Sequence, residues 1–278
     1  MTANPRKIRV SEDCELAVRI DDYVVPWNAK APILMLHGLA ESGEAFRQWV
    51  PHFAHRHMTV RPDLRGFGDS TPMQAGFTYR LDELGRDIIR LLDALELERV
   101  LLIGFKIGGT LAMHLAAKYP ERVIATAAVA APVSLTSFSD RAPGWRELIR
   151  SQGVEPWVRE TTQWRLGSSL PPQAVEWWIS LMARTSPSTL DAFLRMVPTV
   201  DVSTEVPQIK GPTVVITTTG SGLASVDAVR GWQQTIPGST LEVLTSDSYH
   251  VGATHPEDCS RIVRGFFERV TSQEASAL

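Results

Sequence analysis

Residues 104–109 read Gly104-Phe105-Lys106-Ile107-Gly108-Gly109. They follow the short apolar run 100–103 and lead into a helical stretch, 108–119. So sharp a turn between a buried strand and a helix strains the backbone of its central residue, and glycines two positions away on either side relieve the crowding. The turn therefore predicts that the Lys106 side chain is lifted above the edge of a sheet, beside the N-terminus of a helix.

Short apolar runs alternate with helical patterns on both sides of this turn. The runs that predict strands are 33–36, 58–61, 100–103, 123–131, 213–217 and 241–244, with a hairpin at 15–20 and 23–26 before them. The predicted helices are 44–55, 81–95, 108–119, 225–235 and 256–270. This alternation is typical of an α/β fold, in which helices cover both faces of a mostly parallel sheet.

The alternation breaks between residues 132 and 204. No convincing buried strand occurs there, but helical patterns do, at 173–183 and 190–196. Most of the tryptophans also lie in this stretch: Trp145, Trp157, Trp164, Trp177 and Trp178. We therefore predict a core domain formed by residues 1–131 and 205–278, with a helical cap inserted at 132–204.

Composition narrows the function. The 278 residues suit one large α/β domain. A net charge of −3 without a basic stripe argues against a nucleic-acid partner, and no apolar run approaches the roughly 18 residues of a membrane span. Residues 1–9 lack the apolar stretch of a secretory signal, so a cytoplasmic location is expected.

No cofactor is expected. The two cysteines, Cys14 and Cys259, are too far apart in the chain to suggest a disulfide framework or a zinc knuckle. No histidines or carboxylates show metal-ligand spacing, and residues 104–109 lack the full spacing of a phosphate-binding loop.

The motifs and their order resemble the α/β-hydrolase superfamily, in particular its small esterase, enol-lactonase and C–C hydrolase branch with a helical cap. The motifs are His37-Gly38-Leu39, residues 63–70 (Asp-Leu-Arg-Gly-Phe-Gly-Asp-Ser), the turn at 104–109, and His250 followed by Pro256. The resemblance implies a mostly parallel eight-stranded sheet flanked by helices, with the cap inserted. It also implies an oxyanion hole formed by the backbone N–H groups of Leu39 and Ile107. His37, Asp63 and Arg65 are predicted to fix loops.

The same resemblance implies a serine at position 106, an aspartate after the strand at 213–217 and a histidine after the last strand. Lysine stands at 106, no acid stands near Ser221, and His250 is where the histidine is expected. The Ser-His-acid mechanism needs a hydroxyl, a base and an acid that orients the base. The residue types therefore argue against a serine hydrolase. Asp227, just beyond the empty acid position, could reach His250 from the next helix, an arrangement that we do not favour.

Lys106 is the predicted reactive group. Apolar neighbours and the helix N-terminus both favour its neutral amine and lower its pKa. A neutral amine is a nucleophile for carbonyls and a general base, whereas a retained cation would stabilise an enolate or a carboxylate. Schiff-base nucleophile, proton shuttle and charge clamp all stay open.

The leading hypothesis is a cofactor-independent enzyme that acts on a small carbonyl compound, with Lys106 and His250 as the catalytic pair. The reaction would be ester or lactone hydrolysis, or cleavage or rearrangement of a C–C or C–O bond. Because a cap over the turn must line a cavity, Phe105, Trp145, Trp164 and Trp178 are predicted to contact the substrate. Besides the substrate, a second copy of the chain stays open as a partner. The alternative is a non-catalytic protein, a pseudoenzyme, that binds a small ligand under its cap.

Overall fold

A computed structural model describes residues 5–28 and 30–277. Its eight strands form one sheet in the order β1-β2-β4-β3-β5-β6-β7-β8. Their bounds are β1 (Arg6–Ser11), β2 (Cys14–Asp21), β3 (Lys30–Leu36), β4 (His57–Pro62), β5 (Val100–Phe105), β6 (Val123–Val129), β7 (Thr213–Thr218) and β8 (Thr240–Leu244). The pairings β1–β2 and β2–β4 are antiparallel, and the remaining five are parallel. The predicted mostly parallel eight-stranded sheet is confirmed.

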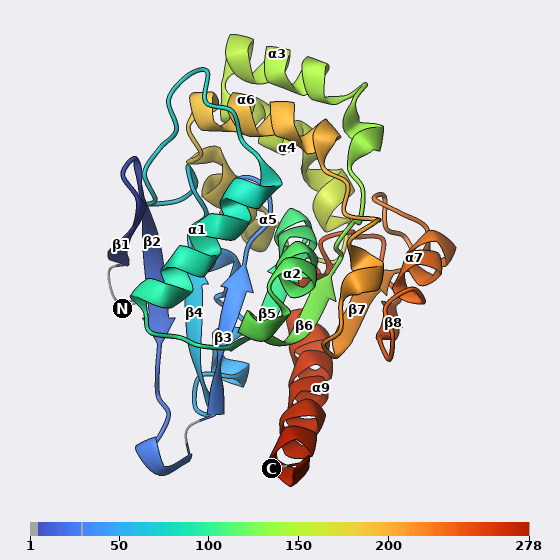
Figure 1. Cartoon of the computed structure of the whole chain (residues 1–278). Helices are drawn as coiled ribbons and strands as arrows, with labels where there is room; N and C mark the ends of the chain where they lie inside the picture. The colour runs from blue at the N-terminus through green and yellow to red at the C-terminus, as the bar shows by residue number, and fades with distance from the viewer. Residues whose placement is uncertain (1–4, 29, 278) are drawn as a thin grey trace.

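Helices cover both faces of this sheet. Their bounds are α1 (Leu81–Ala94), α2 (Ile107–Lys118), α7 (Val226–Gln233), α8 (Val251–Thr254) and α9 (Pro256–Ala277). In Figure 1, α1 and α2 lie in front of the sheet and α9 descends behind it. Successive strand residues point to opposite faces, so Leu34 and Leu36 join the buried cluster on one face while Ile33 and Met35 join the cluster on the other. No helix of these residues is long and apolar enough to cross a membrane.

Four further helices lie between β6 and β7 along the chain, within the stretch predicted to be the cap. They are α3 (Ala142–Gln152), α4 (Val154–Leu166), α5 (Pro172–Ala183) and α6 (Pro187–Met196). Figure 1 shows them gathered at one end of the sheet, where the parallel strands end. An isolated antiparallel bridge between Ser134 and Asp201 joins the two ends of this segment. We refer to residues 132–204 as the cap.

Two local predictions are wrong. The N-terminal hairpin is formed by β1 and β2, so its turn lies at 12–13 and residues 23–26 form no strand. Asp21, the last residue of β2, binds the Arg61 guanidinium on β4 through its carboxylate (Nε···Oδ2 2.8 Å). Residues 44–55 form short 3₁₀ turns rather than one helix, because Pro51 has no backbone N–H to donate within a helix.

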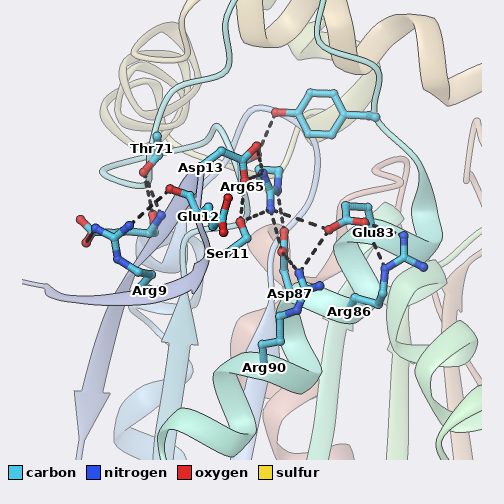
Figure 2. A network of polar contacts seen from close by, with 12 residues as sticks. Arg9, Ser11, Glu12, Asp13, Arg65, Thr71, Glu83, Arg86, Asp87 and Arg90 are labelled. Atoms are coloured by element: carbon cyan, nitrogen blue, oxygen red, sulfur yellow. Dashed lines mark hydrogen bonds and ion pairs between the residues drawn. The ribbon is translucent and has the colours of Figure 1, made fainter.

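Arg65 joins three segments that are distant in sequence (Figure 2). Its guanidinium is buried and binds both carboxylate oxygens of Asp87 on α1 (2.7 and 2.8 Å). It also binds the Asp13 carboxylate and the Ser11 hydroxyl at the turn between β1 and β2. These contacts agree with the loop-fixing role predicted for Arg65.

Replacing Asp87 with Asn should lower the free energy of unfolding by about 2 kcal/mol, since it weakens two charge-assisted hydrogen bonds while Asp13 still pairs with Arg65. Urea denaturation at pH 7 measures this difference. Asp93→Asn is the matched control, because Asp93 lies on the same helix but its side chain is largely exposed where it pairs with Arg122. Its cost should stay below about 1 kcal/mol. Equal costs for the two variants would show that the Arg65 network contributes no more than a surface pair.

Candidate active site

The turn between β5 and α2 holds Lys106 in a strained conformation. Its φ is 53° and its ψ is −121°, in a region that side-chain-bearing residues rarely adopt. A methyl group on Gly104 would overlap the backbone of Gly108 and Gly109, and one on Gly108 would overlap the carbonyls of Leu36 and His37. Both positions therefore require glycine, as the sequence predicts.

The Lys106 side chain lies back against the loop that follows β3. Its Cε packs against Gly38, where a Cβ would overlap it, and the residue is only 6% exposed. Its Nζ forms a buried ion pair with Oε1 of Glu41. The other carboxylate oxygen of Glu41 accepts a hydrogen bond from the Gly38 N–H (3.0 Å). Glu41 is thus fixed from both sides.

His250, which follows the last strand, approaches the same carboxylate. Its Nε2 lies 2.9 Å from Oε1 of Glu41, at ion-pair distance but without the alignment of a hydrogen bond. The imidazole lies between two aromatic rings, Phe105 (centroid distance 5.5 Å) and Trp178 (4.9 Å). The structure therefore brings Lys106 and His250 together, as predicted, through one oxygen of Glu41.

Burial and mutual charge set the protonation of Lys106, Glu41 and His250, which we refer to as the triad. Burial lowers the pKa of Lys106 to about 8, although the Glu41 carboxylate opposes the shift. Burial, together with the Lys106 charge, lowers the pKa of His250 to about 4. Burial alone would raise the pKa of Glu41, but the charges of Lys106 and His250 hold it well below its ordinary value. At pH 7 the site thus holds a carboxylate, a neutral imidazole and a lysine of which about a tenth is the neutral amine.

A cavity of about 500 Å³, open solvent at its mouth included, lies between Lys106 and the cap; Glu41 and His250 lie behind Lys106 and do not line it. Its walls are mostly apolar: Leu39, Ile107, Pro132, Leu135, Phe138, Trp145, Trp164, Val197 and Leu223. The polar side chains that reach it are those of Lys106, Arg165 and Tyr249. The lining includes Leu39 and Ile107, whose backbone N–H groups donate to no other residue in the described ranges. A small, largely apolar ligand fits this shape.

The structure separates the four predicted substrate contacts into two pairs. Trp145 and Trp164 line the cavity. Phe105 and Trp178 do not; they pack on the His250 ring, and Phe105 also contacts Phe46 and Trp49 on the opposite face of the sheet. Trp178 instead lines a separate groove with Trp177 and Arg47.

The other sequence candidates lie away from the chemistry. The Asp227 side chain is 94% exposed and pairs with Arg230, so it does not orient His250. The tautomer of His37 is fixed, because Nε2 accepts from the Leu64 N–H (2.9 Å) and Nδ1 must then donate to the Gly38 carbonyl (2.7 Å). Within residues 5–28 and 30–277, no group of three or more His, Cys, Asp or Glu side chains could hold a metal ion.

Sequence reasoning missed Glu41 and Arg165. One indication of Glu41 was present in the sequence, since it is an acid four residues after His37, in the loop that follows β3. Arg165 carried none, because a single arginine on a cap helix is ordinarily a solvated side chain.

The chain is similar to known hydrolases. A model of the α/β-hydrolase fold family matches residues 31–253. The 3-oxoadipate enol-lactonase 2 of Acinetobacter baylyi is 26% identical over 89% of this chain and 93% of its own length. The 2-hydroxy-6-oxo-2,4-heptadienoate hydrolase of Pseudomonas putida is 31% identical over 48% of this chain and 50% of its own.

Solved structures agree on the fold. The enol-lactonase of Burkholderia xenovorans superposes with a TM-score of 0.85 and 20% identity, covering 94% of this chain and 99% of that one. Together with the family match over residues 31–253, the sheet order and the strand–turn–helix elbow, this shows that the chain belongs to the α/β-hydrolase fold family.

Proposed function

We propose that this protein is a cofactor-independent enzyme that acts on a small carbonyl compound by means of Lys106, Glu41 and His250. Lys106 supplies the amine nucleophile, Glu41 exchanges a proton with it, and His250 acts as a neutral base. The observation that carries the proposal is that Lys106, which lines the cavity, is in buried contact with Glu41, whose carboxylate also lies beside His250. A lysine whose pKa lies near neutrality in such a place is typical of amine catalysis.

The nucleophile favours ketones and aldehydes over esters. The neutral Nζ forms a bond to the carbonyl carbon, the carbonyl oxygen takes up two protons and leaves as water, and a protonated Schiff base remains. That cation accepts the electron pair of the C–C bond at its α-carbon as the bond breaks, and the departing fragment leaves as carbon dioxide from a β-carboxylate or as a carbonyl compound from a β-hydroxyl that gives up its proton. The α-carbon of the resulting enamine takes up a proton, and water then restores the amine and the carbonyl. An ester would instead acylate the amine to an amide, which resists hydrolysis. We therefore favour C–C cleavage or rearrangement over ester or lactone hydrolysis.

Two features of the cavity support this substrate class. Leu39 and Ile107 both line the cavity and have free backbone N–H groups, which would stabilise the oxygen as it becomes negative. Of the two relatives, the 2-hydroxy-6-oxo-2,4-heptadienoate hydrolase is named for an oxo compound, whereas the enol-lactonase is named for a lactone, the ester class that an amine nucleophile does not favour. The largely apolar walls suit a substrate with few other polar groups.

Borohydride trapping tests the proposal. The protein is incubated with a panel of small ketones and aldehydes, reduced with sodium borohydride, and analysed by intact mass and peptide mapping. We expect a reduced adduct on Lys106 and none on the Lys106→Met variant. Lys118→Met is the matched control, because the Lys118 side chain is half exposed and lies outside the cavity; it should keep the adduct.

Two results would contradict the proposed amine chemistry. Turnover that survives in Lys106→Met would overturn every role given to this amine. Ligands that raise the unfolding temperature of the wild-type protein, without adduct or product, would instead support a non-catalytic binding protein.

A further inference from the structure

Arg165 is a buried cation without a carboxylate partner. It lies near the C-terminal end of α4, is 4% exposed and lines the cavity together with Lys106. Its Nε donates to the Tyr249 hydroxyl (3.2 Å), and its Nη1 contacts the Met182 sulfur (3.5 Å). The guanidinium also stacks over the Trp157 ring, 4.5 Å from the centroid. No carboxylate of the described residues lies within ion-pair distance of it.

The other buried arginines do not share this feature. Arg19, Arg61 and Arg65 each pair with at least one carboxylate. Arginine stays protonated in proteins, so Arg165 cannot relieve its burial by losing its charge. An uncompensated buried charge is costly, and such charges are normally paired. Glu41, the buried carboxylate behind Lys106, is already engaged by Lys106 and His250.

We propose that Arg165 is the binding site for a carboxylate on the substrate, so that the substrate is a carbonyl compound that also carries an acid. The carbonyl half of this statement rests on the proposed function, whereas the carboxylate half rests on Arg165 alone. A guanidinium has five N–H donors, and only two of those of Arg165 have partners among the described residues. The free donors form a planar fork that matches a carboxylate.

The surroundings favour a carboxylate over a phosphate. Apart from Lys106 and Tyr249, the side chains that line the cavity with Arg165 are apolar, so a dianion would leave most of its oxygens without donors. A monoanion bound by one fork would balance the single uncompensated charge. Because Lys106 and Arg165 border one cavity, the substrate should bind with its carbonyl at Nζ and its acid at the guanidinium. Affinity should therefore depend on the number of carbons between the two groups.

Binding of oxo acids and their methyl esters tests this site. A chain-length series from 2-oxopropanoate to 6-oxoheptanoate, with 4-oxopentanoate in the middle, is titrated at pH 7 by calorimetry, each acid against its methyl ester. At the best length the wild-type protein should bind the acid about 10- to 100-fold more tightly than the ester. Arg165→Gln should remove this preference, and Arg165→Lys should retain part of it, because it keeps the charge but loses the fork.

Two further variants make the test specific. Arg159→Gln is the matched control, since Arg159 is on the same helix but exposed and paired with Glu155 and Glu176; it should keep the full preference. Lys106→Met should keep it too, which would assign the anion to Arg165 rather than to the amine. Thermal unfolding checks that Arg165→Gln is folded, and its midpoint should not fall, because the substitution removes an uncompensated charge.

The outcomes separate this inference from the proposed function. If no borohydride adduct forms but the acid preference disappears only in Arg165→Gln, the amine chemistry fails and the carboxylate site stands. The site is overturned if the wild-type protein binds acids no better than esters, or if the preference survives in Arg165→Gln.

Discussion

Replacing Glu41 with Gln is expected to lower the free energy of unfolding at pH 7 by about 3 kcal/mol, as for removal of one partner of a buried ion pair. Glu41 is fully buried, and its carboxylate is the partner of the Lys106 ammonium and the close neighbour of His250. In the variant, Lys106 must remain an unpaired buried cation or give up its proton, and either response reduces stability. Denaturant unfolding monitored by tryptophan fluorescence measures the loss.

A double-mutant cycle identifies the cause. Lys106→Met in the Glu41→Gln background should recover much of the lost stability, because neither charge then remains buried. Glu176→Gln, which removes one partner of an exposed pair with Arg159, should cost less than about 1 kcal/mol. If the two substitutions at 41 and 106 were simply additive, the ion pair would not be the source of the effect.

The free energy of unfolding that is lost in Glu41→Gln should also depend on pH. The lowered pKa of Lys106 means that the unfolded chain binds more protons than the folded protein between about pH 8 and the ordinary lysine range near 10.5. In the wild-type protein the ammonium that needs Glu41 therefore disappears above pH 8. Glu41→Gln lowers the pKa of Lys106 further, so between that lower pKa and about pH 8 the folded wild type binds more protons than the folded variant. The difference in stability should therefore shrink as the pH rises towards about 8 and stay level above it.

The sequence predicts the position of Lys106 and His250 because parallel strands bring their carboxyl ends to one edge of the sheet. Any side chain that follows such a strand must lie near that edge, whatever the intervening sequence. It does not predict Glu41, because the pairing with Lys106 joins residues 65 positions apart and depends on how one loop closes over Gly38. The hydrophobic periodicity of the sequence does not indicate how that loop closes.

Some of the predicted substrate contacts do not line the cavity, because neighbours in sequence can face different sides of the structure. Phe105 directly precedes Lys106 in the chain, so its place in the sequence predicts a substrate contact, but the last residue of a strand points to the face opposite its neighbour. The ring accordingly packs with Phe46 and Trp49 beneath the sheet. On the cap helices, spacing alone could not tell that Trp164 and Arg165 face the cavity whereas Trp178 packs on His250.

The rate of borohydride-trappable adduct formation on Lys106 should rise about 50-fold between pH 6 and pH 8, since the neutral fraction of an amine with a pKa of about 8 grows nearly tenfold per pH unit below that value. Single-turnover trapping at a fixed ketone concentration gives the profile. No second break should appear near pH 6.5, because burial lowers the pKa of His250 to about 4 and the ring is neutral throughout this range. A break at 6.5 would mean that His250 is solvated.

Two charge-removing variants should move this midpoint in opposite directions. The Glu41 carboxylate raises the pKa of Lys106 and the Arg165 guanidinium lowers it. Glu41→Gln should therefore shift the rise to lower pH, and Arg165→Gln should shift it to higher pH, even if both variants react more slowly. The position of the midpoint, not the height of the plateau, is the measurement, because a slower reaction alone could reflect a misplaced substrate. Shifts of the same sign would mean that the reacting amine does not lie between these two charges, and the assignment of the nucleophile to Lys106 would have to be abandoned.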